Sequence, residues 1–193
     1  MLNFIAWLTG GGRSYLKKAP PRDEIKSYKK RLRKVMPPGK VKHSLRVGAA
    51  LAGMGENPKT VRAGVFHDYT ERGGDIDKIK GVDRHLVKAV TGEKIAVKKK
   101  VNAPLEHMKH ILTHPSMTPE MKNAVVKLKL TDRLDNVGRR KQASDDYLKK
   151  SRQVVKYVVK HYSGDHGKIH PVLKKFKEAG VDVGKKHIGT LVR

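Results

Sequence analysis

His67 and Asp68 are adjacent residues with metal-binding side chains, and they follow a largely apolar run of the chain. Burying such groups costs free energy unless something pairs with them. Neighbouring residues of a helix point about 100° apart, so a cation that contacts both must take its other ligands from other helices. His43 and Asp132 are suitable, because each lies among regularly spaced apolar residues. These four residues predict a metal site.

The ligand types also narrow the choice of metal. Imidazole and carboxylate groups together suit Mn²⁺, Fe²⁺ or Zn²⁺ better than Ca²⁺. We expect Mn²⁺, with Fe²⁺ and Zn²⁺ as alternatives. Glu71 follows His67 by four residues and Asp68 by three, so a continuous helix would place all three on one side. A carboxylate in that position can accept the proton of an attacking water.

A second polar group lies around Asp132. Four residues there follow the helical spacing i, i+3, i+4, i+7, namely Lys129, Asp132, Arg133 and Asn136. Such a stripe suits a phosphate ester beside a metal. A single His-Asp pair is common by chance, and an Asp in a basic helix is commonly an ion-pair partner. The prediction therefore depends on the ordered set and not on one member.

Three histidines could imitate a ligand stripe, because His107, His110 and His114 also share a helical spacing. Glu106 is the one carboxylate near them in the sequence. We interpret these histidines as surface or packing residues.

The apolar spacing along the chain is helical, which predicts an all-α fold. Pro37-Pro38-Gly39 ends the first helix, and Asn57 and Thr118 are capping residues. We expect a flexible arm over 1–22, a folded domain over 23–162 and a peripheral tail over 163–193 with one short helix, Pro171 to Ala179. The expected helices are Asp23 to Met36, Lys40 to Gly53, Pro58 to Thr70, Asp83 to Val90, Pro104 to Leu112, Thr118 to Val137 and Asp145 to His161.

The composition limits the classes of protein. The chain has 193 residues, of which 37% are hydrophobic, and it has no Cys. A core is therefore expected, whereas a disulfide framework and Cys-based catalysis are excluded. The opening apolar segment is far shorter than the roughly 20 residues that span a bilayer. We expect a cytoplasmic protein without a membrane span.

The net charge is +26, from 44 Lys and Arg against 18 Asp and Glu. Such a field attracts polyanions, including nucleic acid and phosphorylated small molecules. Aromatic residues make up 5% and do not interleave with the basic runs, which argues against a base-stacking surface for single strands.

Together these residues resemble the HD-domain phosphohydrolases, and more narrowly the (p)ppGpp hydrolase domain of RelA/SpoT homologues, which includes small stand-alone proteins. The resemblance covers roughly Lys40 to Tyr162. It is carried by Val41-Lys42-His43-Ser44-Leu45-Arg46-Val47, by Arg62-Ala63-Gly64-Val65-Phe66-His67-Asp68-Tyr69-Thr70-Glu71, by Val90-Thr91-Gly92-Glu93-Lys94, by Leu128-Lys129-Leu130-Thr131-Asp132-Arg133-Leu134-Asp135-Asn136-Val137, and by a closing helix with Asp146-Tyr147.

The resemblance implies an HD-type helical bundle with His43, His67, Asp68 and Asp132 as metal ligands. It implies that Glu71 activates water and that Lys129, Asn136 and Tyr147 contact the nucleotide. The implied reaction is release of pyrophosphate from the 3′ position of (p)ppGpp, with Arg133 among the cations that balance the phosphate charge.

Arg72 is a departure, because the family has Asp after its Glu. The change removes a carboxylate from the catalytic pair and adds a cation. Gly73-Gly74-Asp75 also resembles the HD 5′-nucleotidases. The alternatives are therefore a nucleotidase or dNTP phosphohydrolase, a hydrolase directed at nucleic acid, and a basic HD module that binds without catalysis.

Overall fold

The structure is a computed structural model that describes residues 22–91, 102–139, 144–163 and 166–181. Within these ranges the chain is helical and has no strand, which confirms the all-α prediction. The chain divides into two compact units, Met1–Thr91 and Gly92–Arg193. The predicted arm lies outside the described residues except for Arg22, which begins the first described helix.

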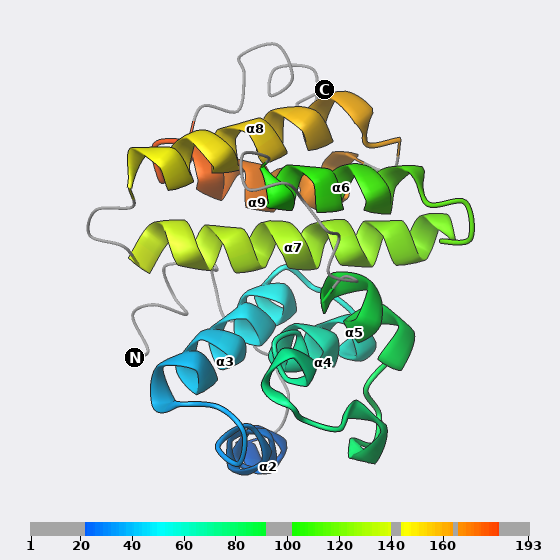
Figure 1. The fold of residues 1–193 in the computed structure, drawn as a ribbon, viewed down its shortest axis with the longest axis vertical. Helices are drawn as coiled ribbons and strands as arrows, with labels where there is room; N and C mark the ends of the chain where they lie inside the picture. Colours follow the sequence, from blue (N-terminus) through cyan, green and yellow to red (C-terminus); the bar gives the residue numbers. More distant parts are fainter. Residues whose placement is uncertain (1–21, 92–101, 140–143, 164–165, 182–193) are drawn as a thin grey trace. The chain divides into compact units, whose positions relative to one another are not determined.

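The first unit is built around two packed helices, α3 (Pro38–Gly53) and α4 (Pro58–Phe66), with α2 (Arg22–Leu32) against α3 and α5 (Arg84–Thr91) against α4 (Figure 1). Two short 3₁₀ turns, η2 (Thr70–Arg72) and η3 (Ile76–Lys78), connect α4 to α5. Helix α3 begins at Pro38, two residues before the expected start. Proline fits the first turn of a helix because its missing N–H has no partner there anyway.

Two glycines let α3 and α4 approach closely. A Cβ on Gly48 would lie 2.3 Å from Val65 Cγ2, and a Cβ on Gly64 would lie 2.3 Å from Leu51 Cδ1 and 3.6 Å from the Cα of Gly48. Both distances of 2.3 Å are too short for real atoms, so no larger residue fits without movement. The absence of side chains at these two positions sets the spacing of the helices.

A polar network fastens α2 to α4. The Nε of Arg62 donates to Glu24 Oε1 at 2.9 Å and to the Tyr28 hydroxyl at 3.0 Å, and that hydroxyl also contacts Glu24. Burial and the bond to Glu24 raise the pKa of Tyr28 to about 12. Although burial raises the pKa of Glu24, the bonds from Tyr28 and Arg62 lower it below the usual value.

The second unit contains α6 (Ala103–Thr113), α7 (Pro119–Arg139), α8 (Asp145–His161) and α9 (His166–Glu178). Helix α7 packs against each of the other three, and α6 also packs against α8. The prediction of a peripheral tail is wrong for the part of 163–193 that the structure describes. Helix α9 is longer than predicted, and its apolar face is buried in the core of this unit through Ile169, Val172, Leu173 and Phe176.

No helix in the described part of the chain combines the length and the apolar composition that crossing a bilayer requires.

Candidate metal centre

Three of the four predicted ligands come together in the first unit. One ligand atom each from His43, His67 and Asp68 lies within 4.8 Å of the other two, the one such group of three among the described residues. His43 and His67 are 4% and 2% exposed, and Asp68 is partly buried. Buried polar groups are kept where something compensates for their lost hydration. The expected clustering of these three residues is therefore confirmed.

The close packing of α3 and α4 produces the cluster. His43 lies on the buried side of α3, one turn before Val47 and Gly48, and His67 follows directly after the last residue of α4. The two imidazole rings meet edge to face with centroids 5.2 Å apart. Larger residues at the glycine contact would move the two helices apart and carry these rings with them.

The backbone of α4 orients the His67 ring. Its Nδ1 lies 2.8 Å from the carbonyl oxygen of Gly64, and a proton on Nδ1 completes that hydrogen bond. The lone pair is then on Nε2, which lies 3.2 Å from Asp68 Oδ1. Two ligands held at about 2.1 Å from one ion at roughly tetrahedral or right angles are about 3.0–3.4 Å apart. The pair therefore has the spacing of two ligands of one ion.

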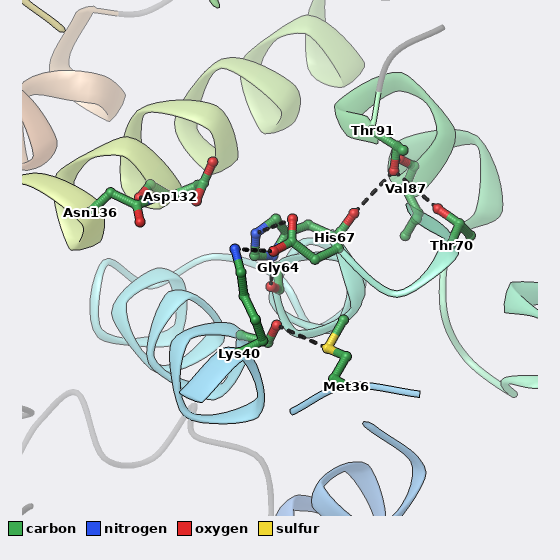
Figure 2. Close-up of polar contacts among 11 residues, drawn as sticks. Met36, Lys40, Gly64, His67, Thr70, Val87, Thr91, Asp132 and Asn136 are labelled. Carbon is green, nitrogen blue, oxygen red and sulfur yellow. Dashed lines mark hydrogen bonds and ion pairs between the residues drawn. The ribbon is translucent and has the colours of Figure 1, made fainter. Parts of the chain in front are cut away.

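Threonine hydroxyls support His67 from the other side, as Figure 2 shows. Thr91 Oγ1, in the last turn of α5, lies 3.0 Å from the carbonyl oxygen of His67 and 2.8 Å from that of Val87. Thr70 Oγ1 lies 3.3 Å from Thr91 Oγ1. The helical bonding of α4 has ended at His67, so its carbonyl needs a donor from elsewhere. No residue spacing indicated this support, because Thr91 lies 24 residues from His67 in the chain.

Lys40 is a second neighbour of the cluster that no residue spacing indicated. Its ammonium lies 3.5 Å from Asp68 Oδ2, and its side chain is 41% exposed. It is on α3, three residues before His43, so it shares that helix side. A cation beside the ligand carboxylate, with access to solvent, is suitably placed for an anionic substrate.

The prediction that His67, Asp68 and Glu71 share one side of a continuous α-helix is wrong. Helix α4 ends at Phe66, and Glu71 and Arg72 belong to η2. The amide of Tyr69 bonds to the carbonyl of Phe66 and that of Arg72 to Tyr69, so the winding has tightened to three residues per turn. Residues four apart no longer align there. Both Glu71 and Arg72 are exposed.

Asp132 lies in the second unit on α7, which is helical throughout Pro119–Arg139, so the predicted spacing applies to it. The amide of Asn136 donates to Asp132 Oδ1 and to the Asp132 carbonyl, both at 3.0 Å. An amide that holds a carboxylate in this way fixes its orientation. Lys129 is half-buried on the same helix.

The polar stripe predicted that Arg133 would face a phosphate, but its surroundings in the structure are different. It is buried, its Nε donates to Ser151 Oγ at 2.9 Å, and its guanidinium lies 4.7 Å from the ring centroid of Tyr147. Burial lowers its pKa. Within the described residues its Nη2 is buried without a hydrogen-bond partner. Arg133 therefore joins α7 to α8.

The remaining motifs have structural roles. Asp75 caps η3, accepting from the amide of Asp77 at 3.0 Å, and pairs with Lys78 at 3.1 Å. The bonds from Lys78 and from that amide lower the pKa of Asp75. His110 and His114 pack edge to face, with ring centroids 5.0 Å apart.

Comparisons with protein-family models, with curated proteins and with solved structures find no match to this chain.

Proposed function

We propose that this protein is a divalent-metal-dependent phosphohydrolase of the HD type that hydrolyses (p)ppGpp. The observation that carries the proposal is the meeting of His43, His67 and Asp68 within 4.8 Å in a buried place. Two imidazoles and one carboxylate are a donor set for Mn²⁺, Fe²⁺ or Zn²⁺. The resemblance in the segments around His43, His67 and Asp132 supports the same class.

The resemblance implies Asp132 as a further ligand, and the proposal adopts it. Three protein ligands leave the coordination of a transition metal incomplete, and α7 already holds the Asp132 carboxylate through Asn136. A bound divalent cation would supply Lewis-acid activation of water and of the phosphoryl group. Lys40 would neutralise phosphate oxygens, and the resemblance assigns nucleotide contacts to Lys129, Asn136 and Tyr147.

Glu71 takes the proton of the attacking water in this mechanism. Its exposed position on η2 is open to solvent, from which the water comes. The balanced reaction is ppGpp plus water giving GDP and pyrophosphate, with the phosphorus–oxygen bond at the 3′ position broken. Arg72, beside Glu71, would add a cation for the departing pyrophosphate.

The first experiment separates metal binding from turnover. Calorimetry with Mn²⁺ is expected to give one site per chain, lost in His67→Ala. The Mn²⁺-loaded protein is then assayed with ppGpp, dNTPs, nucleoside monophosphates and single-stranded oligonucleotides. Pyrophosphate and GDP from ppGpp are expected. Metal binding followed by turnover of another substrate would move the assignment to a different HD phosphohydrolase, and metal binding without any turnover would favour a binding module.

The second experiment tests the catalytic carboxylate. Glu71→Gln should keep the Mn²⁺ site and lose about 10²–10⁴-fold in turnover, because the amide cannot accept a proton. Asp75→Asn is the matched comparison, since Asp75 is an exposed carboxylate four residues later that caps η3. Its activity should stay near wild type. A loss in Asp75→Asn with little change in Glu71→Gln would support the nucleotidase alternative.

A further inference from the structure

Helix α8 carries a row of cations on its exposed face. Lys149, Arg152, Lys156 and Lys160 are all exposed, and at 100° per residue they lie within an arc of about 80°. Their span of 11 residues corresponds to roughly 16 Å of helix. We call these four residues the α8 cation row.

The opposite side of α8 is held in the core. Ser151, Val154, Val155 and Val158 are buried, and α8 packs against α6 and α7. The helix also begins with a cap, because the side chain of Ser144 accepts from the amide of Tyr147. The cation row is therefore presented by a fixed helix and not by a loop.

Local helix electrostatics do not account for the row. The helix dipole favours cations in the last turn, which explains Lys160 but not Lys149, in the second turn. After Asp146 the rest of α8 contains no Asp or Glu. Four cations along one exposed helix face form a local positive field, which attracts a polyanion.

We propose that the α8 cation row binds the phosphate backbone of a nucleic-acid duplex. A duplex has one negative charge per roughly 1.7 Å of axis when both strands are counted, so a straight row of about 16 Å can contact phosphates of the strands that flank a groove. Among the described residues of α8, Tyr157 is stacked on His161 with ring centroids 4.3 Å apart, and no aromatic ring stands in the row. Contact through phosphates and not through stacked bases favours the duplex over a single strand.

A membrane surface is less suitable as the partner. Helices that bind at membranes insert an apolar face, and that face of α8 is already buried in the protein. In the described part of the chain, Ile25 on α2 is the one large hydrophobic residue that is exposed. Attachment to a bilayer would then depend on charge alone. The proposal concerns a surface outside the metal centre and is independent of the hydrolase proposal.

The test compares two variants that each remove four positive charges. One changes the row, as Lys149→Gln, Arg152→Gln, Lys156→Gln and Lys160→Gln. The control changes four exposed lysines on other elements, as Lys59→Gln, Lys80→Gln, Lys88→Gln and Lys177→Gln. Both lower the formal charge from +26 to +22. Circular dichroism checks that both retain their helical content.

Binding of a 20-base-pair duplex is measured by fluorescence anisotropy between about 50 and 200 mM salt. The row variant should lose at least about 100-fold in affinity near 100 mM salt, and its log–log salt slope should be shallower by about 3–4, at roughly 0.9 per lost phosphate contact. The control should change less than about five-fold.

Several results would overturn the proposal. One is an absence of duplex binding by the wild type at about 50 mM salt, and another is an equal loss of duplex affinity in the two variants. The others are tighter binding to a single strand of the same length than to the duplex, and tighter row-dependent binding to phosphatidylserine vesicles than to the duplex. Lysine acetylation of the wild-type protein gives a readout that needs no variant. The duplex should protect Lys149, Lys156 and Lys160 but not the four control lysines.

Discussion

The two units of the chain position their polar residues in different ways. In the second unit, Asp132 and Asn136 lie one turn apart on the regular helix α7 and bond to each other at 3.0 Å. In the first unit, His43 and His67 come from separate helices, and their meeting depends on the contact of Gly48 with Gly64. Regular helical spacing is therefore sufficient for one group, whereas the other needs tertiary packing.

The largest expected effect tests whether the two groups form one site. Asp132→Asn should lower the Mn²⁺ affinity at least about 100-fold, since even an outer-shell partner of a metal ligand is typically worth 10–100-fold. Calorimetry measures the change. Glu120→Gln, an exposed carboxylate in the first turn of the same helix, is the control and should bind as the wild type does. Unchanged affinity in Asp132→Asn would separate α7 from the metal centre.

The next prediction concerns the helix contact in the first unit. Gly48→Ala should destabilise the fold by about 1–2 kcal/mol, because the added methyl group overlaps Val65 and lies 3.4 Å from the Val61 carbonyl. This is the net of about 1–3 kcal/mol of overpacking and a gain of about 0.5–1 kcal/mol in helix propensity.

Urea unfolding measures this loss, and Mn²⁺ affinity should fall with it as His43 moves from His67. Gly39→Ala on the same helix is the control, since a Cβ there has nothing within 4 Å. Equal stability of both variants would show that the glycine contact does not set the helix spacing.

A smaller effect is expected at the support of His67. Thr91→Val removes the hydroxyl near the carbonyls of His67 and Val87 and should lower the Mn²⁺ affinity about 10-fold. The stability cost should be about 1 kcal/mol. Thr91→Ser should restore most of the affinity.

Thr113→Val provides the matched control for that experiment. Thr113 also ends a helix, and its hydroxyl donates to the carbonyl four residues earlier, that of Lys109, at 2.9 Å. The control should lose stability to a similar extent while its metal binding stays unchanged. Loss of Mn²⁺ affinity in both variants would make the effect a general consequence of weakened helices.

The last effect is absent at neutral pH and is a pH dependence of stability in the first unit. The pKa of Tyr28 is raised to about 12 in the folded chain. Its contribution is therefore complete below pH 10 and is lost as the pH rises from about 10 towards 12. The loss should be on the order of 1–2 kcal/mol in urea unfolding. Tyr28→Phe should abolish it, and the same alkaline loss in that variant would assign it to other groups.

The contribution of Glu24 to stability should be lost at acid pH instead of alkaline pH. Because its pKa is lowered in the folded chain, its contribution is present above about pH 4.5 and disappears as the pH falls below that value. Glu24→Gln should flatten the acid limb of the stability profile.

The amino-acid sequence determined the helical elements and the side chains that cluster in the first unit. The apolar spacing predicted most helices to within a few residues, because amphipathic helices need that spacing to bury one face. It also predicted that His43, His67, Asp68 and Asp132 would come together, since such groups are costly to bury unless they share partners, and the first three do cluster. The Asp132–Asn136 relation follows from helical geometry alone.

Tertiary structure decided the rest. The end of α4 at Phe66 removed the expected alignment of Glu71 with His67, because the chain tightens into 3₁₀ turns that no residue spacing indicated. Packing buried Arg133 against Ser151 and Tyr147, and placed α9 in a core instead of a tail. Thr91 supports His67 from 24 residues away. Contacts of this kind join residues that are distant in the chain, so only the folded arrangement determines them.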